Sequence, residues 1–111
     1  MRKVFLISFF LFFSFLAKTQ SVFSVDYQSR ADVKVFVVEY ASQADLKVYR
    51  VNYQSQASKN NGLWFFVDYE SRADKKIYFV DYASQADVKI FFVDYQSQAR
   101  WVNKSKMQLF Y

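Results

Sequence analysis

Six equivalent positions along the chain carry side-chain oxygens of the kind that bind calcium. Each precedes a tyrosine in the phrase aromatic-x-Val-(Asp/Glu/Asn)-Tyr-x-Ser-(Gln/Arg)-Ala, which occurs six times. The positions are Asp26, Glu39, Asn52, Asp68, Asp81 and Asp94. In a closed ring they could converge into an oxygen cage, but each repeat offers only one or two ligands, whereas known calcium loops place several within about a dozen residues. We therefore expect these side chains to bond to the adjacent corner or to pair with basic residues, and we predict no metal or cofactor.

The tyrosines of the same phrase are the second group with a possible binding role. They are Tyr27, Tyr40, Tyr53, Tyr69, Tyr82 and Tyr95. Their large amphipathic rings could form an aromatic platform for a carbohydrate or a peptide. In an extended strand, however, each tyrosine would share a face with the invariant valine two residues before it. We therefore expect the tyrosines to form the repeat core, with their hydroxyls reaching the rim.

The composition offers little material for catalysis. The chain has no histidine, no cysteine and a single glycine. It therefore lacks the commonest general base, a common nucleophile and a glycine-rich phosphate loop. Serines are plentiful, but their recurrence at six equivalent positions favours a structural role. We predict that the protein is not an enzyme.

The first residues follow the pattern of an export signal. Arg2 and Lys3 precede a 14-residue apolar run from Val4 to Ala17, and polar residues follow. This order is typical of a secretory signal peptide, and the run is shorter than the roughly 20 residues of a membrane-spanning helix. We predict a signal peptide over residues 1–19 and a secreted or periplasmic domain over residues 20–111, with no membrane attachment after cleavage. An uncleaved membrane anchor is the alternative.

Each repeat predicts one strand followed by one corner. The β-branched and aromatic residues of Lys34–Tyr40 favour a strand, with Phe36, Val38 and Tyr40 on its nearly invariant face, which we expect to be the core face. The opposite face varies among the copies and is expected to be partly exposed. Aromatic side chains on this variable face could form a partner-facing patch: Trp64, Phe66, Phe79 and Phe92.

The segment between strands reads x-Ser-(Gln/Arg)-Ala-Asp and lacks glycine and proline. Serine and aspartate can bond to nearby backbone groups, so we predict a compact corner built on a single helical turn rather than a tight hairpin. Its alanine is expected to be small because something packs over it. Four of the corner aspartates precede a lysine by two residues, which suggests weak exposed ion pairs.

Two periods are superimposed in the repeats. The tyrosines follow one another at a step of 13 residues, except for one step of 16 residues that contains an insertion around residues 59–62. The corners also repeat as a triple: SRAD occurs in copies one and four, ASQAD in copies two and five, and QSQA in copies three and six. A ring traced twice, with three repeats per lap, would explain this 42-residue period, because copy n would then lie beside copy n+3.

The chain resembles the septoil-knot family of small bacterial domains. The resemblance rests on repeats such as VDYASQADVK and VDYQSQA, and on the ending Trp101-Val102-Asn103-Lys104-Ser105-Lys106. It implies a backbone that forms a seven-crossing torus knot, which can be drawn as two laps twisted round each other. The departures are Arg50-Val51-Asn52 in the third strand and Arg100 in place of an aspartate or serine. The resemblance implies a fold but no site.

Together these observations predict an all-β domain of six strand-plus-corner repeats in two laps of three, knotted by resemblance. Charges of both signs are interleaved along the repeats, so we expect no nucleic-acid partner. The expected function is that of a durable, non-catalytic scaffold for an unknown protein or cell-envelope partner. The alternative is a module that binds a carbohydrate, a peptide or calcium.

Overall fold

The computed structural model describes residues 19–111, and the predicted signal peptide lies outside the described residues except for Thr19. Seven strands are joined by short 3-10 turns. The strands are β1 (Ser21–Ser24), β2 (Val33–Val37), β3 (Leu46–Arg50), β4 (Leu63–Phe66), β5 (Lys75–Phe79), β6 (Val88–Phe92) and β7 (Arg100–Trp101). The turns are η2 (Gln28–Arg30), η3 (Ala41–Gln43), η4 (Gln54–Gln56), η5 (Glu70–Arg72), η6 (Ala83–Gln85) and η7 (Gln96–Gln98), and the longer η8 (Lys104–Phe110) follows β7. Within residues 19–111, no helix has the length and apolar content needed to cross a membrane.

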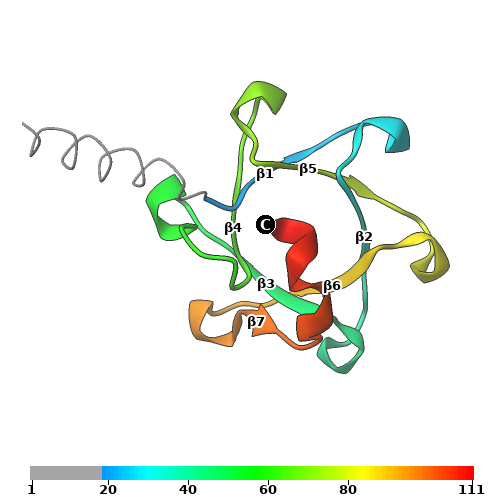
Figure 1. The fold of residues 1–111 in the computed structure, drawn as a ribbon. Helices are drawn as coiled ribbons and strands as arrows, with labels where there is room; N and C mark the ends of the chain where they lie inside the picture. Colours follow the sequence, from blue (N-terminus) through cyan, green and yellow to red (C-terminus); the bar gives the residue numbers. More distant parts are fainter. Residues whose placement is uncertain (1–18) are drawn as a thin grey trace, which may run out of the picture.

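The first six strands form a closed parallel barrel (Figure 1). Their order is β4-β1-β5-β2-β6-β3, and β3 pairs with β4 to close the ring. Strands of the first half therefore alternate with strands of the second half, and each strand lies beside its counterpart three repeats away. This order confirms the prediction of a ring traced twice. The short strand β7 is antiparallel to β3.

Each corner is one 3-10 turn, as predicted, and the six turns project outward around the barrel (Figure 1). In the first corner the N–H of Arg30 donates to the carbonyl of Tyr27, and the N–H of Ala31 donates to the carbonyl of Gln28. The same two bonds recur in the other five corners. The alanine that ends each turn is buried or half-buried, which agrees with the expectation that its small size reflects close packing.

The corner aspartates bind backbone of the other lap. The carboxylate of Asp32 accepts from the N–H of Lys76 at 2.9 Å, and that of Asp87 accepts from the N–H of Lys34 at 2.9 Å. The predicted pairing with a lysine two residues later is therefore wrong. In a parallel ring, each of these corners ends beside the start of a strand of the other lap, so the aspartate at its end accepts from a backbone N–H of that strand.

The register places the inward-facing residues in three stacked layers of six. In ring order, the central layer is Val22, Ile77, Val35, Ile90, Val48 and Trp64, and every member is 0% exposed. The layer at one mouth is Ser24, Phe79, Val37, Phe92, Arg50 and Phe66. The layer at the other mouth is Gln20, Lys75, Val33, Val88, Leu46 and Gly62. Bulky Trp64 in the central layer compensates for three valines, which keeps the layer filled.

The core therefore lies on the face that we predicted to be variable and partly exposed. The ladder of β2 ends at Val37, so the alternation that begins at Val33 and Val35 does not continue to Tyr40. Val38, after the strand, is buried as expected, and its N–H still donates to the carbonyl of Ile90. The aromatic residue at the centre of the strand, Phe36, is half-buried on the outer face.

The last residues of the chain close the mouth that contains Gln20 and Leu46. Trp101 and Phe110 are part of the core, and their rings pack 6.0 Å apart. Asn60, in the insertion, accepts from the indole N–H of Trp101 at 3.0 Å and donates to the carbonyl of Met107 at 2.8 Å. The insertion thus binds the closing segment, which gives a physical reason for the single longer step. Gly62 follows it with φ of +92°.

Candidate functional site

All six motif tyrosines lie on the outside of the protein. Their exposed fractions fall between 63% and 69%, so the prediction that they form the repeat core is wrong. Each occupies the position just before a 3-10 turn, in extended backbone with φ near that of Tyr27, −128°. Their side chains are therefore carried at the bases of the outward corners. The tyrosine-bearing corners are defined here by Tyr27, Tyr40, Tyr53, Tyr69, Tyr82 and Tyr95.

The oxygen-bearing residues before the tyrosines are exposed as well. Because the corners point away from one another around the barrel, these side chains do not converge into a cage. Among residues 19–111, no three acidic, histidine or cysteine side chains lie close enough to hold a metal ion. The calcium-cage geometry considered from the sequence is therefore not formed within this part of the chain.

The four aromatic residues expected on a partner-facing patch lie inside the barrel. Trp64 is 0% exposed, so its assignment to such a patch is wrong. Phe66, Phe79 and Phe92 are half-buried and pack against the core at one mouth, which they share with Ser24, Val37 and Arg50. The guanidinium of Arg50 lies 4.1 Å from the centre of the Phe66 ring, a cation–π contact that covers part of this apolar mouth.

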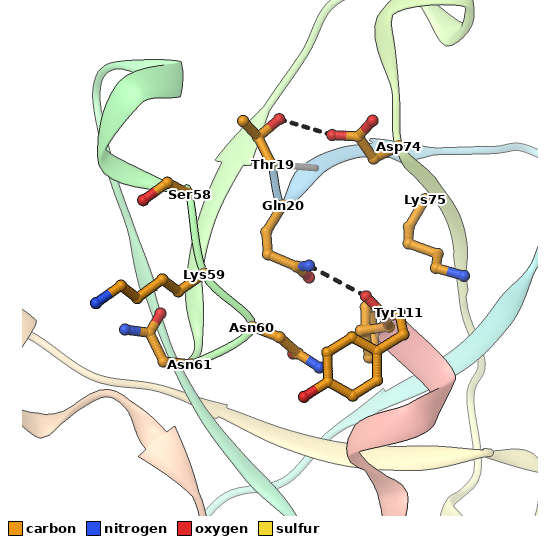
Figure 2. A pocket seen from close by; sticks show the side chains of 10 residues that line it. Thr19, Gln20, Ser58, Lys59, Asn60, Asn61, Asp74, Lys75 and Tyr111 are labelled. Atoms are coloured by element: carbon orange, nitrogen blue, oxygen red, sulfur yellow. Dashed lines mark hydrogen bonds between the residues drawn. The ribbon is translucent and has the colours of Figure 1, made fainter. Parts of the chain in front are cut away.

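A pocket of about 650 Å³ lies at the other mouth, where the closing segment leaves space (Figure 2). The start of β1, the insertion, the start of β5 and the end of the chain contribute its walls. Its lining residues are Thr19, Gln20, Ser58, Lys59, Asn60, Asn61, Asp74, Lys75, Phe110 and Tyr111. Thr19 takes part in the fold, because its hydroxyl donates to the carboxylate of Asp74 at 2.6 Å.

The polar groups of this pocket are not all satisfied within the protein. Gln20 is 5% exposed, and its side-chain N–H donates to the carbonyl of Phe110 at 3.1 Å. Its Oε1 atom is buried without a hydrogen-bond donor. Within residues 19–111, the ammonium groups of Lys59 and Lys75 have no carboxylate within salt-bridge distance. The pocket therefore combines one unpaired acceptor with two unpaired cations.

This pocket was not predicted from the sequence, although two sequence signals mark it. At the first inward position of each strand, three copies have the apolar residues Val33, Leu46 and Val88, whereas the copies that begin β1 and β5 have Gln20 and Lys75. These two strands are neighbours in the ring. The insertion before Gly62 is the second signal, because it interrupts the repeat on the adjacent strand β4.

Comparisons with known proteins give a family but no relatives of assigned activity. Neither a curated protein nor a solved structure matches the chain. Residues 19–102 match the family described as the 7(1) septoil knot domain. The match spans the six barrel strands, the six corners and β7, so it covers the whole ring described above. This chain belongs to the septoil knot family.

Proposed function

We propose that this protein is an exported, non-catalytic module that binds the surrounding cell envelope through its six tyrosine-bearing corners. The observation that carries the proposal is the exposure of all six tyrosines, at 63–69%, in a protein whose central layer is fully buried. A single exposed aromatic ring needs no explanation. Each of the six equivalent rings follows an exposed acid or amide and precedes an exposed serine by two residues. Together they form a repeated recognition unit.

The chemistry of each corner suits contact with a polar polymer. Tyrosine combines a flat apolar ring with a hydroxyl group, which is why it is favoured at wet binding surfaces. The preceding carboxylate, such as Asp81 or Asp94, accepts hydrogen bonds from hydroxyl or amide groups.

The arrangement of the corners favours a meshwork over a single flat partner. The corners radiate around the barrel, so a flat surface can meet only those on one side (Figure 1). A polymer network that surrounds the protein can contact many corners at once. Weak contacts at several corners then add up through effective concentration, without a deep site at any of them.

The barrel supports this role because it resists local opening. Each barrel strand has a hydrogen-bonded neighbour on both sides, and the neighbours belong to the other lap. Pulling one strand away therefore breaks two ladders at once. The seven-crossing knot that we infer from family membership would add a topological obstacle to opening. An exported protein benefits from such resistance, because proteolysis acts on opened states and no ATP-driven refolding is at hand.

Sedimentation with insoluble envelope material tests the proposal. Protein from cells that express the full chain is mixed with the washed cell-envelope fraction of the same cells, and the bound fraction is measured against protein concentration. The test variant replaces Tyr27, Tyr40, Tyr82 and Tyr95 with serine. The control variant replaces the turn glutamines Gln28, Gln43, Gln85 and Gln96 of the same corners with serine.

We expect the tyrosine variant to lose at least about 90% of its bound fraction at low protein concentration, because the losses at separate corners multiply. The glutamine control should retain most of its binding. A folded tyrosine variant that sediments like the unchanged protein overturns the proposal. So does a failure of the unchanged protein to sediment with the envelope at all.

A further inference from the structure

The pocket at the closed mouth contains an unsatisfied recognition site. We propose that it binds a small carboxylate ligand that carries a neighbouring O–H or N–H donor. This goes beyond the proposed function, because it rests on Gln20, Lys75 and their neighbours rather than on the tyrosine-bearing corners. None of the six tyrosines of those corners lines the pocket.

The buried amide of Gln20 supplies an acceptor for the ligand. Its N–H group is fixed by the carbonyl of Phe110, so the opposite atom, Oε1, must be the one that lacks a partner. A buried acceptor without a donor is unfavourable, and a ligand that supplies a donor removes this cost. Figure 2 shows the Gln20 amide directed toward the end of the chain beside Tyr111.

Two lysine side chains line the pocket. Lys59 and Lys75 have no carboxylate partner among residues 19–111, whereas Lys76, the neighbour of Lys75, pairs with Glu70 at 3.6 Å. Asp74 is the only acidic side chain in the lining, and its carboxylate accepts from the N–H of Ser21 at 3.5 Å. The lining side chains thus include two ammonium groups without a side-chain carboxylate partner among residues 19–111, and such groups favour an anionic ligand.

The site is large enough for a small ligand and has an apolar wall. A volume of about 650 Å³ is enough for a ligand of the size of a monosaccharide or a short peptide end. Phe110 contributes an apolar wall that is part of the core, and Tyr111 is 69% exposed. The ring of Tyr111 is therefore free to move aside and admit a donor group to Gln20.

Together the groups define one ligand chemistry. A carboxylate would pair with Lys75 or Lys59, and a hydroxyl or amide hydrogen close to it would donate to Oε1 of Gln20. An acidic sugar such as a uronic acid has this combination, and so does the carboxyl end of a peptide. The two sources share the recognition chemistry, and the probes below distinguish them.

Binding is measured by calorimetry and by ligand-induced shifts in the NMR spectrum, on protein purified from cells that express the full chain. The probes are D-glucuronate and N-acetyl-L-alanine, and the controls are their uncharged counterparts, D-glucose and N-acetyl-L-alaninamide. We expect one acidic probe to bind saturably with a Kd on the order of 1 mM, and the uncharged control to bind at least about tenfold more weakly. The acidic probe that binds identifies the source.

Three variants locate the binding. Lys75→Met and Gln20→Leu should each weaken binding of the acidic probe by about tenfold or more. Lys76→Met is the matched control, because Lys76 neighbours Lys75 but does not line the pocket, and it should leave the affinity unchanged. Lys59→Met, at an exposed position, keeps the test valid if Lys75→Met or Gln20→Leu does not fold.

Two results would overturn the proposal. One is the absence of saturable binding by both acidic probes at concentrations on the order of 20 mM, which is about twenty times the expected Kd. The other is equal binding of the charged and uncharged probes, or equal binding by the folded Lys75, Lys59 and Lys76 variants. Envelope sedimentation of the Lys75→Met variant separates the two proposals, because loss of the pocket should leave corner-mediated binding intact.

Discussion

Asp45 and Lys89 bind each other's backbone across the two laps. The N–H of Asp45 donates to the carbonyl of Lys89 at 2.7 Å, and the N–H of Lys89 donates to the Asp45 carboxylate at 2.9 Å. Asp32 with Lys76 and Asp87 with Lys34 form the same reciprocal pair. These pairs join residues that are 44 or 53 positions apart in the chain. The repeated corner aspartate is therefore the residue that fastens one lap to the other.

Replacing Asp45 should destabilise the protein more than replacing the equivalent Asp32. Asp45 is 8% exposed, and its carboxylate also contacts the closing segment through Asn103 at 3.4 Å and Lys106 at 3.5 Å. We expect Asp45→Ala to lower the free energy of unfolding by about 2–3 kcal/mol, because several partners lose a buried acceptor. Asp32→Ala, at an exposed corner, should cost about 1 kcal/mol.

Denaturant unfolding followed by circular dichroism measures both losses. Ala31→Ser, beside the corner of Asp32, serves as a background control for substitutions in this turn. Equal losses for Asp45→Ala and Asp32→Ala would show that the contacts with Asn103 and Lys106 contribute nothing.

A side chain at Gly62 should prevent the ring from closing normally. A Cβ atom there would lie 2.4 Å from the carbonyl oxygen of Lys47 and 3.2 Å from the backbone nitrogen of Arg100, and the φ of +92° disfavours any L side chain. We expect Gly62→Ala to lower the free energy of unfolding by at least about 3 kcal/mol. Asn61→Ala, next to it and exposed, should change stability by less than about 0.5 kcal/mol. A thermal melt of Gly62→Ala that matches the unchanged protein would contradict the close approach of β3, β4 and β7.

The positions of the core layers can be tested with one buried and one motif residue. Ile77 is 0% exposed in the central layer, and Tyr82 is 68% exposed. We expect Ile77→Ala to cost about 2–5 kcal/mol, because it removes buried methyl groups and leaves a cavity. Tyr82→Ala should cost less than about 0.5 kcal/mol. The midpoint of guanidinium unfolding distinguishes the two, and a larger loss at Tyr82 would restore the tyrosine core that the structure contradicts.

Asn60 should couple the insertion to the closing segment. Asn60→Leu leaves the indole N–H of Trp101 and the carbonyl of Met107 without their partner, and we expect a loss of about 1–3 kcal/mol. Trp101 is 4% exposed, so loosening of this segment should also shift tryptophan fluorescence to longer wavelength. Asn61→Leu is the matched control and should leave the emission unchanged. Unaltered fluorescence and stability in Asn60→Leu would remove the structural reason for the insertion.

The interleaved laps should make unfolding slow. Because each barrel strand is flanked by strands of the other lap, and a knot is inferred on top of this, partial opening exposes little chain. We expect an unfolding half-life in water of at least hours, at the slow end of the range for small domains. Stopped-flow and manual mixing into denaturant, extrapolated to water, measure it. A half-life of seconds, or digestion of the repeats by excess protease before the residues after Lys104, would argue against durability as a selected property.

The two-lap architecture was predictable because the corner sequences repeat with a period of three copies. Copies one and four share an arginine at Arg30 and Arg72, and a ring traced twice explains this triple period. The ring order confirms it. The single helical turn at each corner was also predictable, because the linking segment contains no glycine or proline.

The inward face was not predictable from the repeat itself. We assumed that an invariant position such as Tyr40 must be a core position, but each tyrosine lies exposed just before the 3-10 turn of its corner. The true core position tolerates Val22, Ile77 and Trp64, because a layer of six is filled by the sum of its members rather than by each one. The strand boundary at Val37, which decides the face, depends on pairing with the other lap.

The pocket was not predicted, for a related reason. Gln20 and Lys75 look like ordinary polar residues at strand ends, and 55 positions separate them in the chain. Only the ring order makes them neighbours. The end of the chain then has to turn back across the mouth before Phe110 can face Gln20.

Because strands of the two laps alternate around the ring, neither half of the chain can form a closed barrel alone. Without the other strands, β1, β2 and β3 would not pair with one another, and each would lack a hydrogen-bonded neighbour on both sides. The gaps between these strands are filled by the three repeats of the second half, which carry the same motif as the first half. The protein is in this sense a tethered dimer, in which the segment around Asn60 is the tether. If the chain is divided there, the two halves should assemble in trans at a rate that depends on concentration. A single half should form a homodimer.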